Sequence, residues 1–151
     1  MPKLLMFGVC RQAILNAQDQ SISLISLMPG LSVPVSQSET VSEDTVAPLF
    51  FGVALQWLVQ PEDQGKQFEH RFQIVKPDGN IYPMSTSTVV AEKNNVSVVL
   101  QGMGFPVGVP GVYHVTVDLR ESGQSQEWQK FGEYPIEVFH VTQEEALIAP
   151  I

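Results

Sequence analysis

Apolar and polar residues alternate along much of the chain with the two-residue period of strands that bury one face. The alternation is clearest in residues 67–75 and 112–120. In the first segment, His70 falls on the apolar face between Phe68 and Phe72. We therefore expect both segments to be strands, with His70 as a core histidine held by hydrogen bonds.

Six further segments have strand length and lie between turn signals. They are residues 3–11, 21–28, 49–59, 81–91, 96–101 and 126–141. The polar turn at residues 16–19 predicts that the first two form a hairpin. Pro135 lies inside the last segment, and a proline cannot donate a ladder hydrogen bond, so we expect an edge, a bulge or a change of sheet there.

The longest predicted loop, residues 34–48, is rich in Ser, Thr and acidic residues and lacks aromatic residues. Long loops without secondary structure are often functional or mobile. A frayed edge strand through Val41 and Val46 is the alternative. The sequence does not decide whether residues 36–47 are ordered.

About eight strands without a convincing intervening helix predict an all-β fold, an antiparallel immunoglobulin-like β-sandwich. We expect one domain over residues 2–142. The remaining residues, 143–151, form an apolar C-terminal tail.

Composition and charge exclude several classes of protein. The 151 residues carry a formal net charge of −8, are 44% hydrophobic and include one cysteine. This apolar content is sufficient for a core and excludes disorder over most of the chain. Eight scattered Lys and Arg residues disfavour nucleic-acid binding. A single cysteine excludes an internal disulfide.

The N-terminal residues 3–10 can be interpreted as a short export signal or as a buried strand. The apolar run has the minimum length for a signal core, and Val9 is bulky where processing favours a small residue. We favour a strand with a buried Cys10. No apolar run has the length of a membrane span, so we expect a soluble cytoplasmic protein without membrane contact.

Three separated pieces of the chain carry a resemblance to a known family. They are the opening hairpin, the strand 67–75 with its turn Pro77-Asp78-Gly79, and the region from Gly104-Phe105-Pro106 through Pro110-Gly111-Val112-Tyr113 to the closing strand at 134–138. Together these pieces resemble a family of small bacterial β-sandwich proteins known as a domain of unknown function. The resemblance covers most of residues 3–141. It implies a sandwich fold and no activity.

The residues that usually carry catalysis do not form a recognisable motif. The three histidines lack metal-ligand spacing, and there is no nucleophile elbow or phosphate-binding glycine loop. We expect no catalytic residue and no cofactor. A metal-dependent enzyme that uses His114, Asp118 and His140 remains an alternative, provided that the last strands pair in a suitable register.

Two apolar segments are candidate partner-binding surfaces. The Gly-rich connector 102–111 presents Phe105, Val107 and Val109, either as an interaction tip or as a crossing between sheets that caps the core. The tail contributes its own apolar residues, Leu147, Ile148 and Ile151. These residues predict a non-catalytic binding or assembly module whose partner is another protein or a second copy. The partner and the oligomer size cannot be read from the sequence.

Aromatic residues provide the first alternative function, a small-molecule or carbohydrate-binding sandwich. Trp57, Trp128 or Tyr134 would stack on the ligand. Trp128 lies in a polar stretch and is expected to be more exposed than Trp57.

Overall fold

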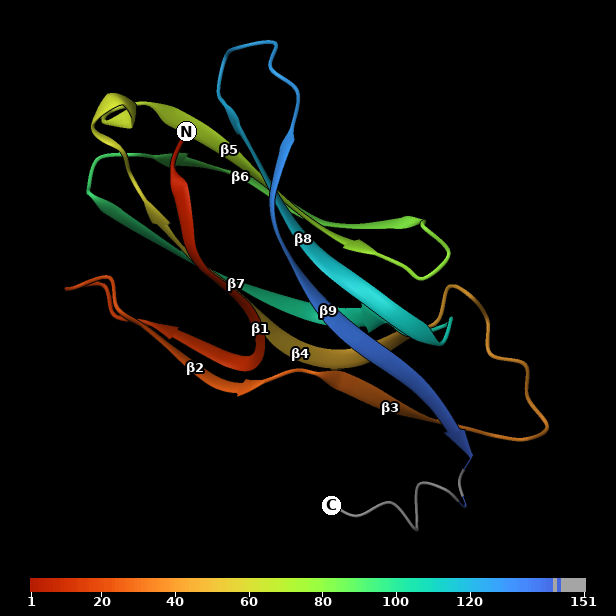
Figure 1. The fold of residues 1–151 in the computed structure, drawn as a ribbon. Coiled ribbons are helices and arrows are strands. Elements are labelled where there is room, and N and C mark those ends of the chain that lie inside the picture. The colour runs from red at the N-terminus through yellow and green to blue at the C-terminus, as the bar shows by residue number, and fades with distance from the viewer. Residues whose placement is uncertain (143, 145–151) are drawn as a thin grey trace.

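The computed structural model describes residues 1–142 and 144, and within them the chain forms nine strands in two packed sheets (Figure 1). The predicted all-β class is confirmed. The strands are β1 (Lys3–Leu15), β2 (Ile22–Leu27), β3 (Gly30–Val35), β4 (Val46–Leu58), β5 (Gln67–Val75), β6 (Ile81–Val90), β7 (Asn95–Pro106), β8 (Gly111–Glu121) and β9 (Gln129–Thr142). A 3-10 turn, η1 (Pro61–Asp63), follows β4.

One sheet has the strand order β2-β1-β4-β7 and the other has the order β3-β9-β8-β5-β6. Neighbouring strands are antiparallel except for β3 and β9, which run parallel. Figure 1 shows β1 bending along its length, so that the first sheet curls into a half-barrel. The tip of the β1–β2 hairpin reaches β7, where the Ser97 hydroxyl donates to the Gln20 carbonyl over 2.6 Å.

The core lies between the two sheets and is built from the alternating faces that the sequence predicts. On β8, the inward residues Tyr113, Val115, Val117 and Leu119 are fully buried. They meet the inward face of β4, which includes Phe51 and Trp57. His70 lies in this core as predicted, but neither ring nitrogen has a hydrogen-bond partner among the described residues, so the predicted hydrogen bonds are absent.

All eight predicted strands are present, and β3 is an additional strand that the sequence did not predict. It is six residues long, begins directly after Pro29 and contains Pro34. Its only partner is β9, more than 100 residues later in the chain. Because this pairing is parallel and distant, no hairpin signal marks it.

Pro135 occupies a locally unpaired edge, as predicted. β9 lies between β3 and β8, but its pairing with β3 begins only at Glu137. Residues before Glu137 have β8 as their sole strand neighbour, and Pro135 lies opposite His114 there. The missing N–H of Pro135 therefore costs no ladder hydrogen bond.

Residues 102–111 were predicted to be a connector, but only residues 107–110 form the crossing between sheets. β7 extends to Pro106, and Gly104, at a φ of +92°, lies at a break in the β4–β7 register. This irregularity turns Phe105 from the outer face into the core, where Val107 is also buried. The Tyr113 hydroxyl donates to the Val109 carbonyl over 2.7 Å and fixes the end of the crossing.

The acidic segment before β4 is a loop, and residues 36–45 contain no strand. The Val107 amide donates to the Thr45 carbonyl over 2.9 Å. A Cβ atom on Gly108 would lie 2.3 Å from the Ser42 carbonyl oxygen, so only glycine permits the loop to approach this closely. The loop therefore packs against the crossing, and Val46 belongs to β4 rather than to a separate edge strand.

Residues 3–15 form the predicted strand, and Cys10 is fully buried in it. Burial raises the pKa of the Cys10 thiol above its usual value, which keeps the thiol protonated and unreactive near neutral pH. No helix among the described residues is long and apolar enough to cross a membrane. Cytoplasmic location stays a prediction.

Candidate functional site

The three residues of the predicted metal site do not come together. His114 pairs with Pro135, and His140 lies five residues further along β9, about 17 Å away and on the opposite face of the sheet. Asp118 instead forms an ion pair with Arg71. His140 Nε2 lies 2.6 Å from the Val107 carbonyl. The described residues contain no group of three or more potential metal ligands.

The aromatic residues of the carbohydrate-binding alternative are also separated. Trp128 is half-buried, whereas Trp57 is 1% exposed, as predicted. The guanidinium groups of Arg71 and Arg120 lie 4.6 and 4.3 Å from the Trp128 ring centroid. These cation–π contacts hold the ring against β5 and β8, and ligand stacking on Trp128 stays a prediction.

Tyr134 is half-buried, packs against the core and lies six residues from Trp128, about 20 Å along the chain. It borders a shallow hollow of about 380 Å³ with Pro29, Val112 and Glu137. The two aromatic residues therefore belong to different sites.

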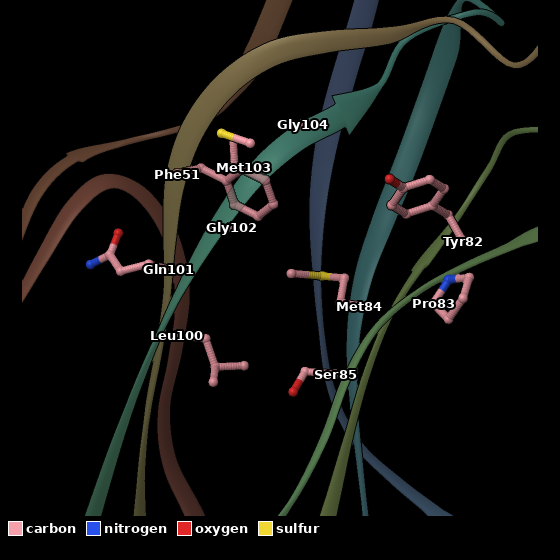
Figure 2. A pocket seen from close by; sticks show the side chains of 10 residues that line it. All are labelled: Phe51, Tyr82, Pro83, Met84, Ser85, Leu100, Gln101, Gly102, Met103 and Gly104. Atoms are coloured by element: carbon pink, nitrogen blue, oxygen red, sulfur yellow. The ribbon is translucent and has the colours of Figure 1, made fainter.

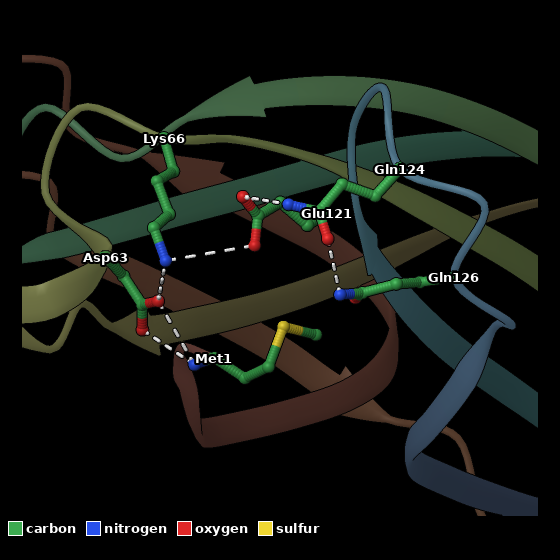
Figure 3. Close-up of polar contacts among 6 residues, drawn as sticks. All are labelled: Met1, Asp63, Lys66, Glu121, Gln124 and Gln126. Carbon is green, nitrogen blue, oxygen red and sulfur yellow. Dashed lines mark hydrogen bonds and ion pairs between the residues drawn. The ribbon is translucent and has the colours of Figure 1, made fainter.

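A cluster of charged side chains at one end of the sandwich has a structural role (Figure 3). The Asp63 carboxylate is 1% exposed and lies 2.9 Å from the Met1 α-amino group and 3.6 Å from Lys66 Nζ. Lys66 Nζ also lies 3.8 Å from the Glu121 carboxylate. These contacts join the start of β1 to η1 and to the end of β8, and each buried charge has a partner.

The predicted partner-binding residues of the crossing are mostly inaccessible. Phe105, near the end of β7, is 0% exposed, and Val107, in the crossing, is 1% exposed. Both belong to the core, which agrees with the alternative that these residues cap it. This burial removes both from the candidate surface, and Val109 is half-buried. The other three candidates, Leu147, Ile148 and Ile151, lie outside the described residues.

The edges of the two sheets are a feature that the sequence did not reveal directly. The edge strands are β2 and β7 in one sheet and β3 and β6 in the other. None of the four contains a charged residue, although the chain has 24 (16 acidic and 8 basic). Proteins usually protect exposed edges with charges, prolines, bulges or short strands, because unpaired N–H and C=O groups recruit other strands.

Of these four edges, that of β7 is the least protected. β2 and β3 have six residues each, and Pro34 interrupts β3. β6 contains Pro83 at an irregularity in its pairing with β5. β7 has twelve residues, and its pairing with β4 runs without interruption from Asn95 to Met103. No proline or charge interrupts this part of β7.

A cleft opens between β7 and β6, where the two sheets separate (Figure 2). Its volume is about 340 Å³. Figure 2 shows Leu100 and Met103 on β7 on one side and Tyr82 and Met84 on β6 on the other. No Asp, Glu, Lys, Arg or His lines it; the remaining lining residues are Phe51, Pro83, Ser85, Gln101, Gly102 and Gly104.

The two most exposed large apolar side chains among the described residues lie beside this cleft. Met103 is 72% exposed and Phe50 is 69% exposed, and they face each other as a cross-strand pair on β7 and β4. We define the free edge of β7 from Val98 to Met103, the cleft and Phe50 as the β7 edge site. It combines unpaired backbone groups with apolar side chains, which suits an added polypeptide strand.

Comparison with protein-family models finds no match to this chain, and comparison with curated protein sequences finds none either. The resemblance to the uncharacterised β-sandwich family therefore stays a prediction.

Proposed function

We propose that this chain is a non-catalytic binding or assembly module that contacts another polypeptide through the β7 edge site. The proposal rests on one observation. The least protected edge strand, β7, lies where the two most exposed apolar side chains, Met103 and Phe50, are found. Strand addition satisfies the unpaired backbone groups, and burial of these side chains adds hydrophobic stabilisation.

The fold that we propose for this module is an immunoglobulin-like sandwich with nine strands. The hydrogen bond from the Tyr113 hydroxyl to Val109, four residues upstream near the start of β8, supports it. A tyrosine bonded to nearby upstream backbone is a recurring feature of such sandwiches. A small-molecule site at the Tyr134 hollow is the alternative function, and the hollow has a size that small ligands occupy.

Affinity capture with three forms of the protein tests the proposed function. Immobilised wild-type chain, Met103→Lys and Ile25→Lys are each incubated with a lysate of the source organism that also contains untagged chain. Ile25 is a suitable control because it is exposed and apolar but lies on β2. We expect a polypeptide that both wild type and Ile25→Lys retain and that Met103→Lys loses, because a lysine beside the β7 edge opposes strand addition.

Mass spectrometry identifies the retained polypeptides. Identical sets from all three forms would contradict the proposal, as would loss from Ile25→Lys alone. A Met103-dependent partner other than the chain itself would support a binding module for a foreign protein. Retention of untagged chain alone would support an assembly module.

A further inference from the structure

We infer that the polypeptide that occupies the β7 edge site is a second copy of this chain, paired antiparallel through β7 about a two-fold axis. The inference rests on the proposed function and specifies its partner. In such a dimer the two four-stranded sheets join as β2-β1-β4-β7-β7-β4-β1-β2. Each copy contributes the same strand, β7, to the interface.

The charge distribution permits a second copy at β7 and opposes one over most of the remaining surface. Each chain carries a net charge of −8, so two copies repel each other over most of their surfaces. No charged residue occurs between Lys93 and Asp118, a segment that contains all of β7. Antiparallel pairing of two β7 strands therefore places no like charges directly opposite each other. Such charges would destabilise the strand pair.

The position of the remaining charges also fits the antiparallel arrangement. The turn before β7 carries Glu92 and Lys93, whereas the residues at the opposite end of β7 and in the crossing carry no charge; the acidic loop with Glu43 packs against that crossing. In an antiparallel pair the Glu92–Lys93 turn of one copy lies toward this end of the other, so the two Glu92 side chains stay apart. A parallel pair would place the two Glu92 side chains together, and a two-fold axis perpendicular to the strands excludes that arrangement.

The surroundings of β7 explain where pairing occurs. The hairpin turn at Gln20 contacts β7 at Ser97, near the start of the strand. The stretch from Val98 to Met103 follows this contact and pairs regularly with β4. In an antiparallel strand, alternate residues direct their N–H and C=O groups away from the existing partner. This stretch therefore presents a short ladder of unpaired groups, with the Phe50–Met103 pair beside it.

The test measures the molecular mass of the purified full chain over a range of concentrations by sedimentation equilibrium. We expect a reversible dimer for wild type. Gln101→Lys/Met103→Lys places two lysines on exposed positions of β7, and we expect it to raise the dimer dissociation constant by at least about tenfold. The control Ile25→Lys/Leu27→Lys places the same two charges at the same spacing on β2 and should dimerise as wild type does.

Urea unfolding of each variant, measured at a concentration where wild type is monomeric, separates loss of pairing from loss of folding. The substituted side chains are exposed, so the unfolding midpoints should match there. A wild-type chain that stays monomeric would overturn the inference, as would a dimer that survives the β7 lysines. A monomeric wild type that still captures a foreign protein through Met103 would overturn the inference that the partner is a second copy. The proposed function would then stand. A monomer without any Met103-dependent partner would overturn both.

Discussion

His70→Phe is expected to remove the part of the acid sensitivity of folding that arises from protonation of His70. His70 is fully buried, and burial lowers its pKa from 6.5 to about 4. Its ring stacks on Trp57 with a centroid distance of 5.6 Å and an interplanar angle of 15°. Phenylalanine preserves an aromatic ring at this place and removes two buried nitrogen atoms that have no partner among the described residues.

The direction of the pH effect follows from proton binding. Above pH 6.5, His70 is neutral in both the folded and the unfolded state and contributes no pH dependence. Between pH 6.5 and about 4, the unfolded chain binds a proton that the folded chain excludes, so the free energy of unfolding falls as the pH falls. A shift of about 2.5 units corresponds to about 3 kcal/mol over this window.

Urea unfolding at about pH 7 and about pH 4 measures the difference. We expect wild type to lose about 3 kcal/mol more than His70→Phe between the two conditions. Titration of carboxylates is common to both proteins and cancels in the comparison. His114→Gln serves as the control because His114 is half-exposed, and it should retain the wild-type loss. Equal losses for wild type and His70→Phe would contradict the prediction.

Gly102→Ala is expected to destabilise the chain by about 1–3 kcal/mol, although alanine usually stabilises a strand relative to glycine. Gly102 lies directly opposite Phe51 on β4. A Cβ atom on Gly102 would lie 2.4, 2.7 and 2.8 Å from three carbon atoms of the Phe51 ring. The ring is 1% exposed and packs edge-on against Phe105, so it cannot move aside without disturbing the core.

Gly8→Ala is the matched control for this substitution. Gly8 also lies in a strand, has no positive φ, and a Cβ atom there would meet Leu27 at 3.4 Å, an ordinary van der Waals contact. We expect its unfolding free energy to stay within about 0.5 kcal/mol of wild type or to rise slightly. If urea unfolding ranks Gly102→Ala as equal to or more stable than Gly8→Ala, the packing argument at Phe51 is incorrect.

Local patterns in the sequence were sufficient to predict most of the fold. Strands such as β5 and β8 alternate cleanly, and their turns carry the residues that turns require. β3 was not predicted, because its partner β9 is distant in the sequence and runs parallel to it. The extension of β7 to Pro106 was also not predicted, since four glycines between Gly102 and Gly111 suggested a connector. Gly102 is required by the Phe51 ring and Gly104 by a register change, and both causes are tertiary.

The candidate site was less predictable, because it depends on which strands become edges. Phe105 and Val107 are apolar residues in a Gly-rich segment, which suggested an interaction surface. The irregularity at Gly104 instead directs their side chains into the core. Met103, two residues earlier, is exposed. The absence of charge between Lys93 and Asp118 is a signal in the sequence itself. It becomes informative only when the topology places β7 at the edge of its sheet.

Amide hydrogen exchange as a function of protein concentration tests whether β7 is the edge through which this chain binds a second copy. We expect alternate amides from Val98 to Met103, those that point away from β4, to exchange more slowly as the concentration rises. Amides on the free edges of β2, β3 and β6 should keep their rates. Pairing through β7 would be contradicted if the β7 amides exchanged at a rate independent of concentration. It would also be contradicted if only amides on another edge slowed.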